Sequence, residues 1–184
     1  MTHQAMSDET LSALYDGIRD VADFPEPGIV YKDITPLLLD HRLFRQATDA
    51  MIAMVQESPP DKVMVIESRG FLFGAPLAHD LDAGLVLARK KGKLPWKTHA
   101  IEYSLEYGTD TIEVHQDAIQ DGERVLIVDD VLATGGTAGA AVGAVEHCGG
   151  IAAGVLVLIE LSDLGGHAKL NGVPVHSVLQ YPQV

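Results

Sequence analysis

The sequence has almost no cysteine and no long apolar run. Cys148 is the single cysteine among the 184 residues, which excludes an internal disulfide and leaves no thiolate cluster for a metal ion. No apolar run approaches the ~20 residues that a transmembrane helix needs. The start of the sequence is polar and acidic, unlike a secretory signal peptide. We therefore expect a soluble cytoplasmic protein that does not associate with membranes.

Positive charge is scarce as well, and it is unevenly distributed. The chain has 13 Lys and Arg residues against 26 Asp and Glu residues, a formal net charge of −13 that argues against a nucleic-acid-binding surface. Five of the 13 basic residues lie between positions 89 and 97, namely Arg89, Lys90, Lys91, Lys93 and Lys97. Either they form a solvated basic loop, or they bind a small polyanion that an otherwise acidic protein meets at this loop.

Short apolar runs alternate with helical patterns along most of the chain. The expected strands are residues 63–66, 85–88, 125–128 and 153–159, and the expected helices are residues 40–56, 71–81 and 137–147. Strands that are apolar throughout and alternate with helices indicate an α/β fold, a mostly parallel central sheet with helices on both faces. We expect a single domain over residues 1–184.

Two further segments have patterns of their own. Before residue 24, apolar residues recur at helical spacing, which predicts a helix with Ser7 or Asp8 as its N-cap. The apolar residues are Leu11, Leu14, Ile18 and Val21. Residues 101–107 and 111–114 alternate around a Gly-Thr-Asp turn, which predicts a β-hairpin.

Residues 125–137 carry the most informative functional signal. Their sequence, VLIVDDVLATGGT, places a buried strand, two adjacent carboxylates and a Thr/Gly loop directly before a helix. Main-chain N–H groups of Thr134 to Thr137, with the helix N-terminus, can surround a phosphate. Gly136 stands where a Walker loop has its Lys, and the glycine spacing of dinucleotide sites is absent. The sequence therefore predicts a phosphate site of another kind.

The two carboxylates, Asp129 and Asp130, suit the hydroxyl groups of a sugar. A ribose whose 5′-phosphate lies in the Thr/Gly loop can donate hydrogen bonds from its 2′- and 3′-hydroxyls to them. Two solvated Asp residues at a strand end are the alternative interpretation, and the loop that follows favours the ribose. In parallel sheets ligands bind beyond the carboxyl ends of the strands, which we expect at Glu67, Arg89, Asp129 and Glu160.

Residues 125–137 resemble the signature of type I phosphoribosyltransferases that binds phosphoribosyl pyrophosphate (PRPP). Other segments resemble the adenine-specific members of this family. These segments are 67–74, their pyrophosphate loop; 89–95 and 103–108, their mobile catalytic flap; and 24–36, their base-covering hood. We call residues 24–36 the hood and residues 89–114 the flap.

The resemblance implies a glycosyltransferase of purine salvage. Such an enzyme joins adenine to the ribose of PRPP and releases AMP and pyrophosphate. It also implies a homodimer, and Mg²⁺ that arrives with PRPP and not in a metal site built by the protein. A phosphoribosyltransferase for hypoxanthine, guanine or xanthine is one alternative, and a PRPP-sensing regulator without catalysis is another.

Position by position, the resemblance assigns each part of PRPP to its own residues. The 5′-phosphate is expected at Ala133, Thr134, Gly135, Gly136 and Thr137, and the ribose at Asp129 and Asp130. The pyrophosphate is expected at Ser68, Arg69, Gly70, Arg89, Lys90 and Lys93. The peptide bond Glu67–Ser68 is expected to be cis, and Arg89 is expected to act across the dimer interface.

The base and the catalytic groups are assigned in the same way. Adenine is expected against main-chain groups near Val30 and Lys32, with Val131 packed on the base. The catalytic residues implied are Arg69 and Glu106, of which Glu106 is the acid/base acting at the purine. Glu102 lies four residues earlier, could face the same side of the hairpin, and is the alternative for that role.

Overall fold

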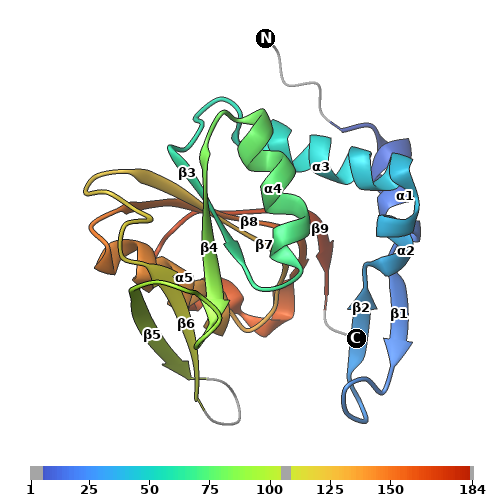
Figure 1. The fold of residues 1–184 in the computed structure, drawn as a ribbon. Helices are drawn as coiled ribbons and strands as arrows, with labels where there is room; N and C mark the ends of the chain where they lie inside the picture. Colours follow the sequence, from blue (N-terminus) through green and yellow to red (C-terminus); the bar gives the residue numbers. More distant parts are fainter. Residues whose placement is uncertain (1–5, 105–108, 183–184) are drawn as a thin grey trace.

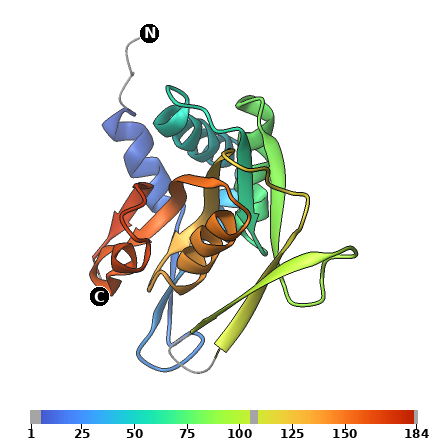
Figure 2. The same ribbon diagram turned by 90° about the vertical axis from the view of Figure 1, so that its left-hand side faces the viewer.

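A seven-stranded sheet forms the centre of the molecule, with helices on both faces (Figure 1, Figure 2). The computed structural model describes residues 6–104 and 109–182. The strand order is β5-β6-β4-β3-β7-β8-β9. The neighbouring strands β4, β3, β7, β8 and β9 pair parallel to one another. At the other end of the sheet, β6 pairs antiparallel with β4 and with β5. The predicted α/β class with a mostly parallel sheet is therefore confirmed.

The strands of this sheet alternate with two of the helices. In chain order the elements are β3 (Lys62–Ile66), α4 (Gly70–Asp80), β4 (Gly84–Lys90), β5 (Thr98–Ser104), β6 (Thr109–His115), β7 (Arg124–Leu132), α5 (Gly136–His147), β8 (Ile151–Leu161) and β9 (Val175–Tyr181). Two short 3₁₀ helices, η1 (Ser162–Leu164) and η2 (Gly166–Lys169), connect β8 to β9. The sequence predicted these strands and helices except β9, η1 and η2.

The N-terminal part adds three helices and a separate two-stranded sheet. Its elements are α1 (Asp8–Asp16), β1 (Arg19–Ala22), β2 (Val30–Asp33), α2 (Thr35–Leu39) and α3 (His41–Val55). β1 and β2 pair antiparallel and form a hairpin that projects beside the main sheet (Figure 1). Across residues 6–104 and 109–182, no helix has both the length and the apolar character needed to cross a bilayer.

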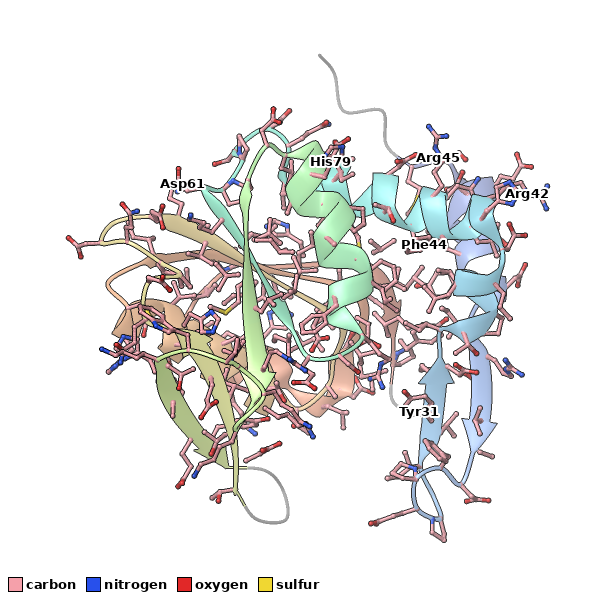
Figure 3. The ribbon with its side chains drawn as sticks, viewed as in Figure 1. Tyr31, Arg42, Phe44, Arg45, Asp61 and His79 are labelled. Atoms are coloured by element: carbon pink, nitrogen blue, oxygen red, sulfur yellow. The ribbon has the colours of Figure 1, made fainter. Side chains whose placement is uncertain are left out.

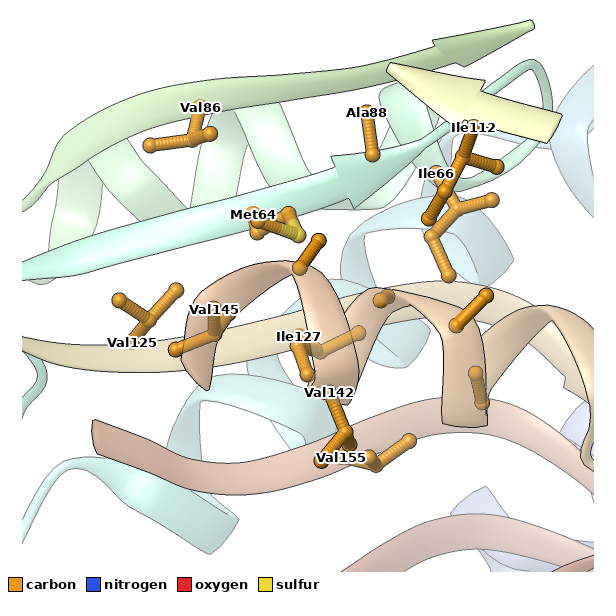
Figure 4. Close-up of a cluster of buried hydrophobic side chains, with 14 of the residues drawn as sticks. Met64, Ile66, Val86, Ala88, Ile112, Val125, Ile127, Val142, Val145 and Val155 are labelled. Atoms are coloured by element: carbon orange, nitrogen blue, oxygen red, sulfur yellow. The ribbon is translucent and has the colours of Figure 1, made fainter. Parts of the chain in front are cut away.

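The sheet is held between two hydrophobic cores. Successive residues of β3 pack on opposite faces, as the strand geometry requires. Met64 and Ile66 belong to the core under α5, whereas Val63 and Val65 belong to the core under α3 and α4. Figure 4 shows the first core, in which Val142 of α5 lies against side chains of the strands. Because both faces are packed, the strand ends and the loops that leave them are held in fixed positions.

The N-terminal helix is shorter than the sequence predicted. Ser7 caps α1 with its side chain, as expected, but the helix ends at Asp16 and Gly17 caps its C-terminus. Val21 lies in β1 and pairs with Tyr31 of β2. The prediction of a helix through Val21 was wrong because strand pairing outweighs the local helical pattern.

β7 is longer than predicted. The sequence indicated a strand end directly before Asp129, but pairing with β8 continues through Asp129 as far as Leu132. Asp is disfavoured in strands, and the long ladder with β8 overrides that preference. The expectation that Asp129 marks the carboxyl end of its strand was therefore wrong, and both carboxylates lie within β7.

Candidate active site

A cavity of about 660 Å³ lies at the carboxyl ends of β3 and β7. Three segments and three single residues line it: 29–32, 66–69, 129–138, Lys90, Val157 and Leu161. One wall comes from the β1–β2 hairpin, where Tyr31 is labelled in Figure 3. Segments far apart in the sequence therefore meet at the edge of the sheet where ligands of such folds bind.

The Thr/Gly loop between β7 and α5 presents main-chain N–H groups to this cavity. Gly135 caps α5 with a φ of +76°, in the left-handed region that favours glycine. No side chain of the described residues caps this N-terminus, so the first N–H groups of α5 have no partner within the helix and can bind an anion. All the residues expected at the 5′-phosphate, Ala133 to Thr137, line the cavity.

Beside the loop lie two neighbouring carboxylates, one of which is paired with a guanidinium. Arg69, the residue before α4, donates a hydrogen bond from Nε to Asp130, which is only 2% exposed. Asp129 Oδ1 accepts the main-chain N–H of Asp130 at 2.9 Å. Burial and the adjacent Asp130 carboxylate raise the pKa of Asp129 well above 3.8. Among the described residues, Arg69 is paired with Asp130 and not with Asp129.

Only some of the residues expected at the pyrophosphate line the cavity. Ser68, Arg69 and Lys90 line the cavity, and the peptide bond Glu67–Ser68 is cis, as predicted. Gly70 is buried at the first position of α4 and does not line the cavity.

Arg89 and Lys93 also lie outside the lining, and Arg89 is held by other groups. Its Nε donates to Glu67 Oε2 at 3.3 Å, and its Nη1 donates to the carbonyl oxygen of Lys93 at 2.9 Å. Burial acts to raise the pKa of Glu67, but the main-chain N–H of Lys90 and the Arg89 guanidinium outweigh it and lower the pKa below 4.5. Glu67, which the sequence did not single out as a binding residue, thus ties the start of the flap to the pyrophosphate loop.

The hairpin wall brings the residues expected at adenine to the cavity. Val30, Lys32 and Val131 all line it. The side chain of Lys32, however, contacts Asp20 and Tyr181, which do not line the cavity. Its Nζ is 2.7 Å from Asp20 Oδ1 and 4.3 Å from the centroid of the Tyr181 ring. The ammonium of Lys32 is therefore committed to the support of the hairpin.

Tyr31 is a cavity residue that sequence reasoning missed. The guanidinium of Arg69 lies 5.6 Å from the centroid of its ring. Alternate side chains of a strand point to opposite sides, so Tyr31 faces away from the side to which Lys32 points. That alternation is the signal in the sequence that places Tyr31 toward the cavity.

The proposed acid/base, Glu106, lies outside the described residues, between β5 and β6. The alternative, Glu102, is exposed on β5, where it pairs with Thr111, and it does not line the cavity. Among the described residues of the flap, Lys90 alone lines the cavity. The predicted hairpin of the flap is confirmed by the antiparallel pairing of β5 with β6.

Comparisons with known proteins identify relatives for nearly the whole chain. Residues 37–169 match the family model described as the phosphoribosyl transferase domain. An adenine phosphoribosyltransferase of Acidothermus cellulolyticus is 53% identical over 89% of this chain and 92% of its own length.

Solved structures give the same picture. The crystal structure of adenine phosphoribosyltransferase from Rhodothermus marinus is 56% identical, covers 95% of this chain and 100% of its own, and superposes with a TM-score of 0.90. The Saccharomyces cerevisiae enzyme, crystallised with an imino-altritol bisphosphate and adenine, is 37% identical, covers 94% of this chain and 100% of its own, and has a TM-score of 0.89.

The raised pKa of Asp129 predicts that this carboxylate destabilises the fold at neutral pH. Above about pH 4 the unfolded chain releases the proton that the folded chain retains, so stability falls as the pH rises towards the folded-state pKa. Asp129→Asn should therefore increase the free energy of unfolding at about pH 7 and have little effect near pH 4. Urea denaturation at both pH values measures this, with the exposed Asp117→Asn as the control. A variant less stable than the wild type at neutral pH would contradict the prediction.

Proposed function

The chain belongs to the phosphoribosyltransferase family, and from that membership we propose that it joins adenine to the ribose of PRPP, releasing AMP and pyrophosphate. The reaction is a glycosyl transfer of purine salvage. The observation that carries the proposal is the order of groups along the cavity. The Thr/Gly loop comes first, Asp129 and Asp130 lie beside it, and Arg69 follows. A 5-phosphate, ribose hydroxyls and a pyrophosphate follow one another in the same order along PRPP.

In this proposal the cavity binds the phosphoribosyl group through groups that are already in position. The N–H groups of Ala133 to Thr137 donate to the 5′-phosphate. Asp129 and Asp130 accept hydrogen bonds from the ribose hydroxyls. These charge-assisted bonds are stronger than hydrogen bonds between two neutral groups. The support for this assignment is that all these residues line one cavity.

The leaving group is assigned to the cationic side of the cavity. As the bond to pyrophosphate breaks, the ribosyl group gains positive charge and the pyrophosphate gains negative charge. Ser68 and Arg69 stand next to the carboxylates, and Lys90 is the one described residue of the flap that reaches the lining. Cations placed there stabilise the growing negative charge, and closure of the flap excludes water that would hydrolyse the ribosyl cation. Arg89 and Lys93 are assigned to the same task after the flap has moved.

Mg²⁺ fits the charge of this cavity as an ion carried by PRPP. Two carboxylates, Asp129 and Asp130, face one guanidinium, that of Arg69, so a cation is electrostatically favoured. Within the described residues, no three His, Cys, Asp or Glu side chains are arranged to bind a metal ion. When bound, Mg²⁺ neutralises pyrophosphate oxygens and makes the group a better leaving group.

Adenine is assigned to the wall that the β1–β2 hairpin provides. Main-chain groups near Val30 and Lys32 can distinguish a 6-amino from a 6-oxo purine, because one edge donates where the other accepts. Val131 lies on β7 and Tyr31 on β2, and both line the cavity where an apolar surface would pack on the base. The fixed side chain of Lys32 supports this assignment because it holds the main chain of the wall in place.

A homodimer in the cytoplasm completes the proposal. Leu72 on α4 is 44% exposed, and Leu85 and Leu87 on β4 are 46% and 39% exposed. Leu85, Leu87 and Arg89 are alternate residues of β4 and so share one face of the strand. A partner that covers the leucines would therefore come close to Arg89, which supports a site shared between subunits.

The reaction itself is the first prediction of this proposal. With Mg²⁺ and PRPP, the protein should form AMP from adenine, with kcat/KM roughly 10²-fold or more above that for hypoxanthine, guanine and xanthine. A coupled assay with each base, with and without Mg²⁺, measures this. Faster turnover of another purine would assign a different substrate. PRPP binding without product from any base would favour a regulator.

The acid/base role is tested by comparing two carboxylates of the flap. Glu106→Gln should lower kcat by roughly 10²–10⁴-fold in both directions while the KM for PRPP changes little, because the residue acts on a purine proton. Glu102→Gln is the matched control on the neighbouring strand β5 and should retain activity. Wild-type kcat in Glu106→Gln, or loss of activity only in Glu102→Gln, would overturn the assignment.

The shared site is tested by mixing two inactive variants. Arg89→Ala and Glu106→Gln should each be nearly inactive alone. If Arg89 serves the partner's site, a statistical mixture of dimers should recover roughly a quarter of the wild-type activity, since half the dimers then contain one intact site. Analytical ultracentrifugation should show a dimer that the double change Leu85→Glu and Leu87→Glu dissociates, whereas Leu39→Glu, at a residue 85% exposed, should not. An active monomer, or no recovery on mixing, would refute the shared site.

A further inference from the structure

The Thr/Gly loop rests on main chain from a distant part of the sequence. A methyl group placed on Gly135 would lie 2.3 Å from the carbonyl oxygen of Gly166. One placed on Gly166 would lie 2.4 Å from the carbonyl oxygen of Ala133. Both distances are far below van der Waals contact, so the two backbones touch and a side chain fits at neither position. Gly166, the first residue of η2, therefore lies directly against the loop.

A buried carboxylate holds the residue that follows Gly166. His167 Nε2 lies 2.5 Å from Glu160 Oε1, and Glu160 is only 6% exposed near the end of β8. An ionised carboxylate can only accept hydrogen bonds, so His167 donates from Nε2. The other carboxylate oxygen, Oε2, accepts from Ser177 Oγ at 2.8 Å and from Gln180 Nε2 at 3.5 Å. Residues of β8 and β9 thus fix the carboxylate that fixes His167.

The geometry separates His167 from the cavity. Its side chain is 57% exposed, and neither it nor Glu160 lines the cavity. The end of η2 is anchored in another way, because Leu170 is fully buried in the core under α5. The bond between His167 and Glu160 therefore acts at the other end of η2, where Gly166 touches the loop.

We propose that the hydrogen bond between His167 and Glu160 positions the phosphate-binding loop through Gly166. His167 and Glu160 are then positioning residues for substrates that carry a 5-phosphate, an inference that rests on the proposed function because it takes residues 133–137 as the 5′-phosphate site. N–H groups held in place beforehand bind an anion without the cost of ordering the loop. Freeing Gly166 would let the loop move and would weaken phosphate binding, whereas the adenine wall would be unaffected.

Binding of ribose 5-phosphate, which has the phosphate and lacks the pyrophosphate, tests this directly. By calorimetry, His167→Ala should bind it roughly tenfold more weakly, the effect of about one charge-assisted hydrogen bond. The KM for PRPP should rise by a similar factor, while kcat and the KM for adenine stay within roughly twofold. His167→Gln retains an N–H donor and should recover most of the loss. His41→Ala, at an exposed residue that does not line the cavity, is the control and should resemble the wild type.

Gly166→Ala tests the same contact from the side of the loop and should give the same selective loss, because the new methyl group displaces Ala133. If His167→Ala does not fold, the affinities of Gly166→Ala and His167→Gln for ribose 5-phosphate test the inference in its place. Unchanged affinity for ribose 5-phosphate in His167→Ala, equal loss of adenine and ribose 5-phosphate binding, or no recovery in His167→Gln would overturn the inference. A wild-type protein that binds ribose 5-phosphate but forms no AMP would instead contradict the proposed function.

Discussion

The incomplete neutralisation of two adjacent carboxylates governs the chemistry of the cavity. Asp130 is buried and paired with Arg69, and Asp129 has no second guanidinium of its own among the described residues around it. A charge that leaves water without a full partner raises the free energy of the folded state. A ligand that donates hydroxyl groups and brings a cation lowers that energy. In the proposed site, a strongly acidic chain binds a polyanion through N–H groups of a loop and not through a basic surface.

The fold separates the parts of the site that must stay fixed from the part that belongs to the sheet edge. The carboxylates, the Thr/Gly loop and Arg69 come from β7, α5 and the start of α4, all of which pack in the two cores. The flap belongs to the β5–β6 hairpin, and β5 is the edge strand of the sheet. Elements with packing on both faces open less readily than a hairpin at an edge. In the proposed function, the rigidly packed elements β7, α5 and α4 bind the phosphoribosyl group. The β5–β6 hairpin, which lies at the sheet edge and opens more readily, excludes water.

The sequence predicted the parts of this structure that have local signatures. Uniform apolar runs identified β3, β7 and β8 because both faces of these strands are buried. The apolar run of β4 was identified in the same way, although its Leu85 and Leu87 are partly exposed. The sequence of β9, VHSVLQY, interrupts its apolar residues with polar ones because the strand lies at a sheet edge, and it was missed. The motif of the loop and the two carboxylates located most of the cavity. The contact between Gly135 and Gly166 joins two backbones and has no side-chain pattern, so no reading of the sequence could have found it.

The anchoring of Lys32 has a consequence for the entropy of base binding at the proposed adenine site. Its buried ammonium joins β1, through Asp20, to the ring of Tyr181 in β9, and Tyr15 of α1 exchanges two hydrogen bonds with the main chain of Gln180. The hairpin wall is therefore tied to the main sheet through β9 before any ligand arrives. Its conformational freedom is lost during folding, as part of the same cooperative event that forms β9, and not when a base binds. A flat and rigid molecule that enters such a cavity loses mainly its own translational and rotational freedom. Little of the free energy of its contacts is then spent on ordering the protein, so even a small purine can bind.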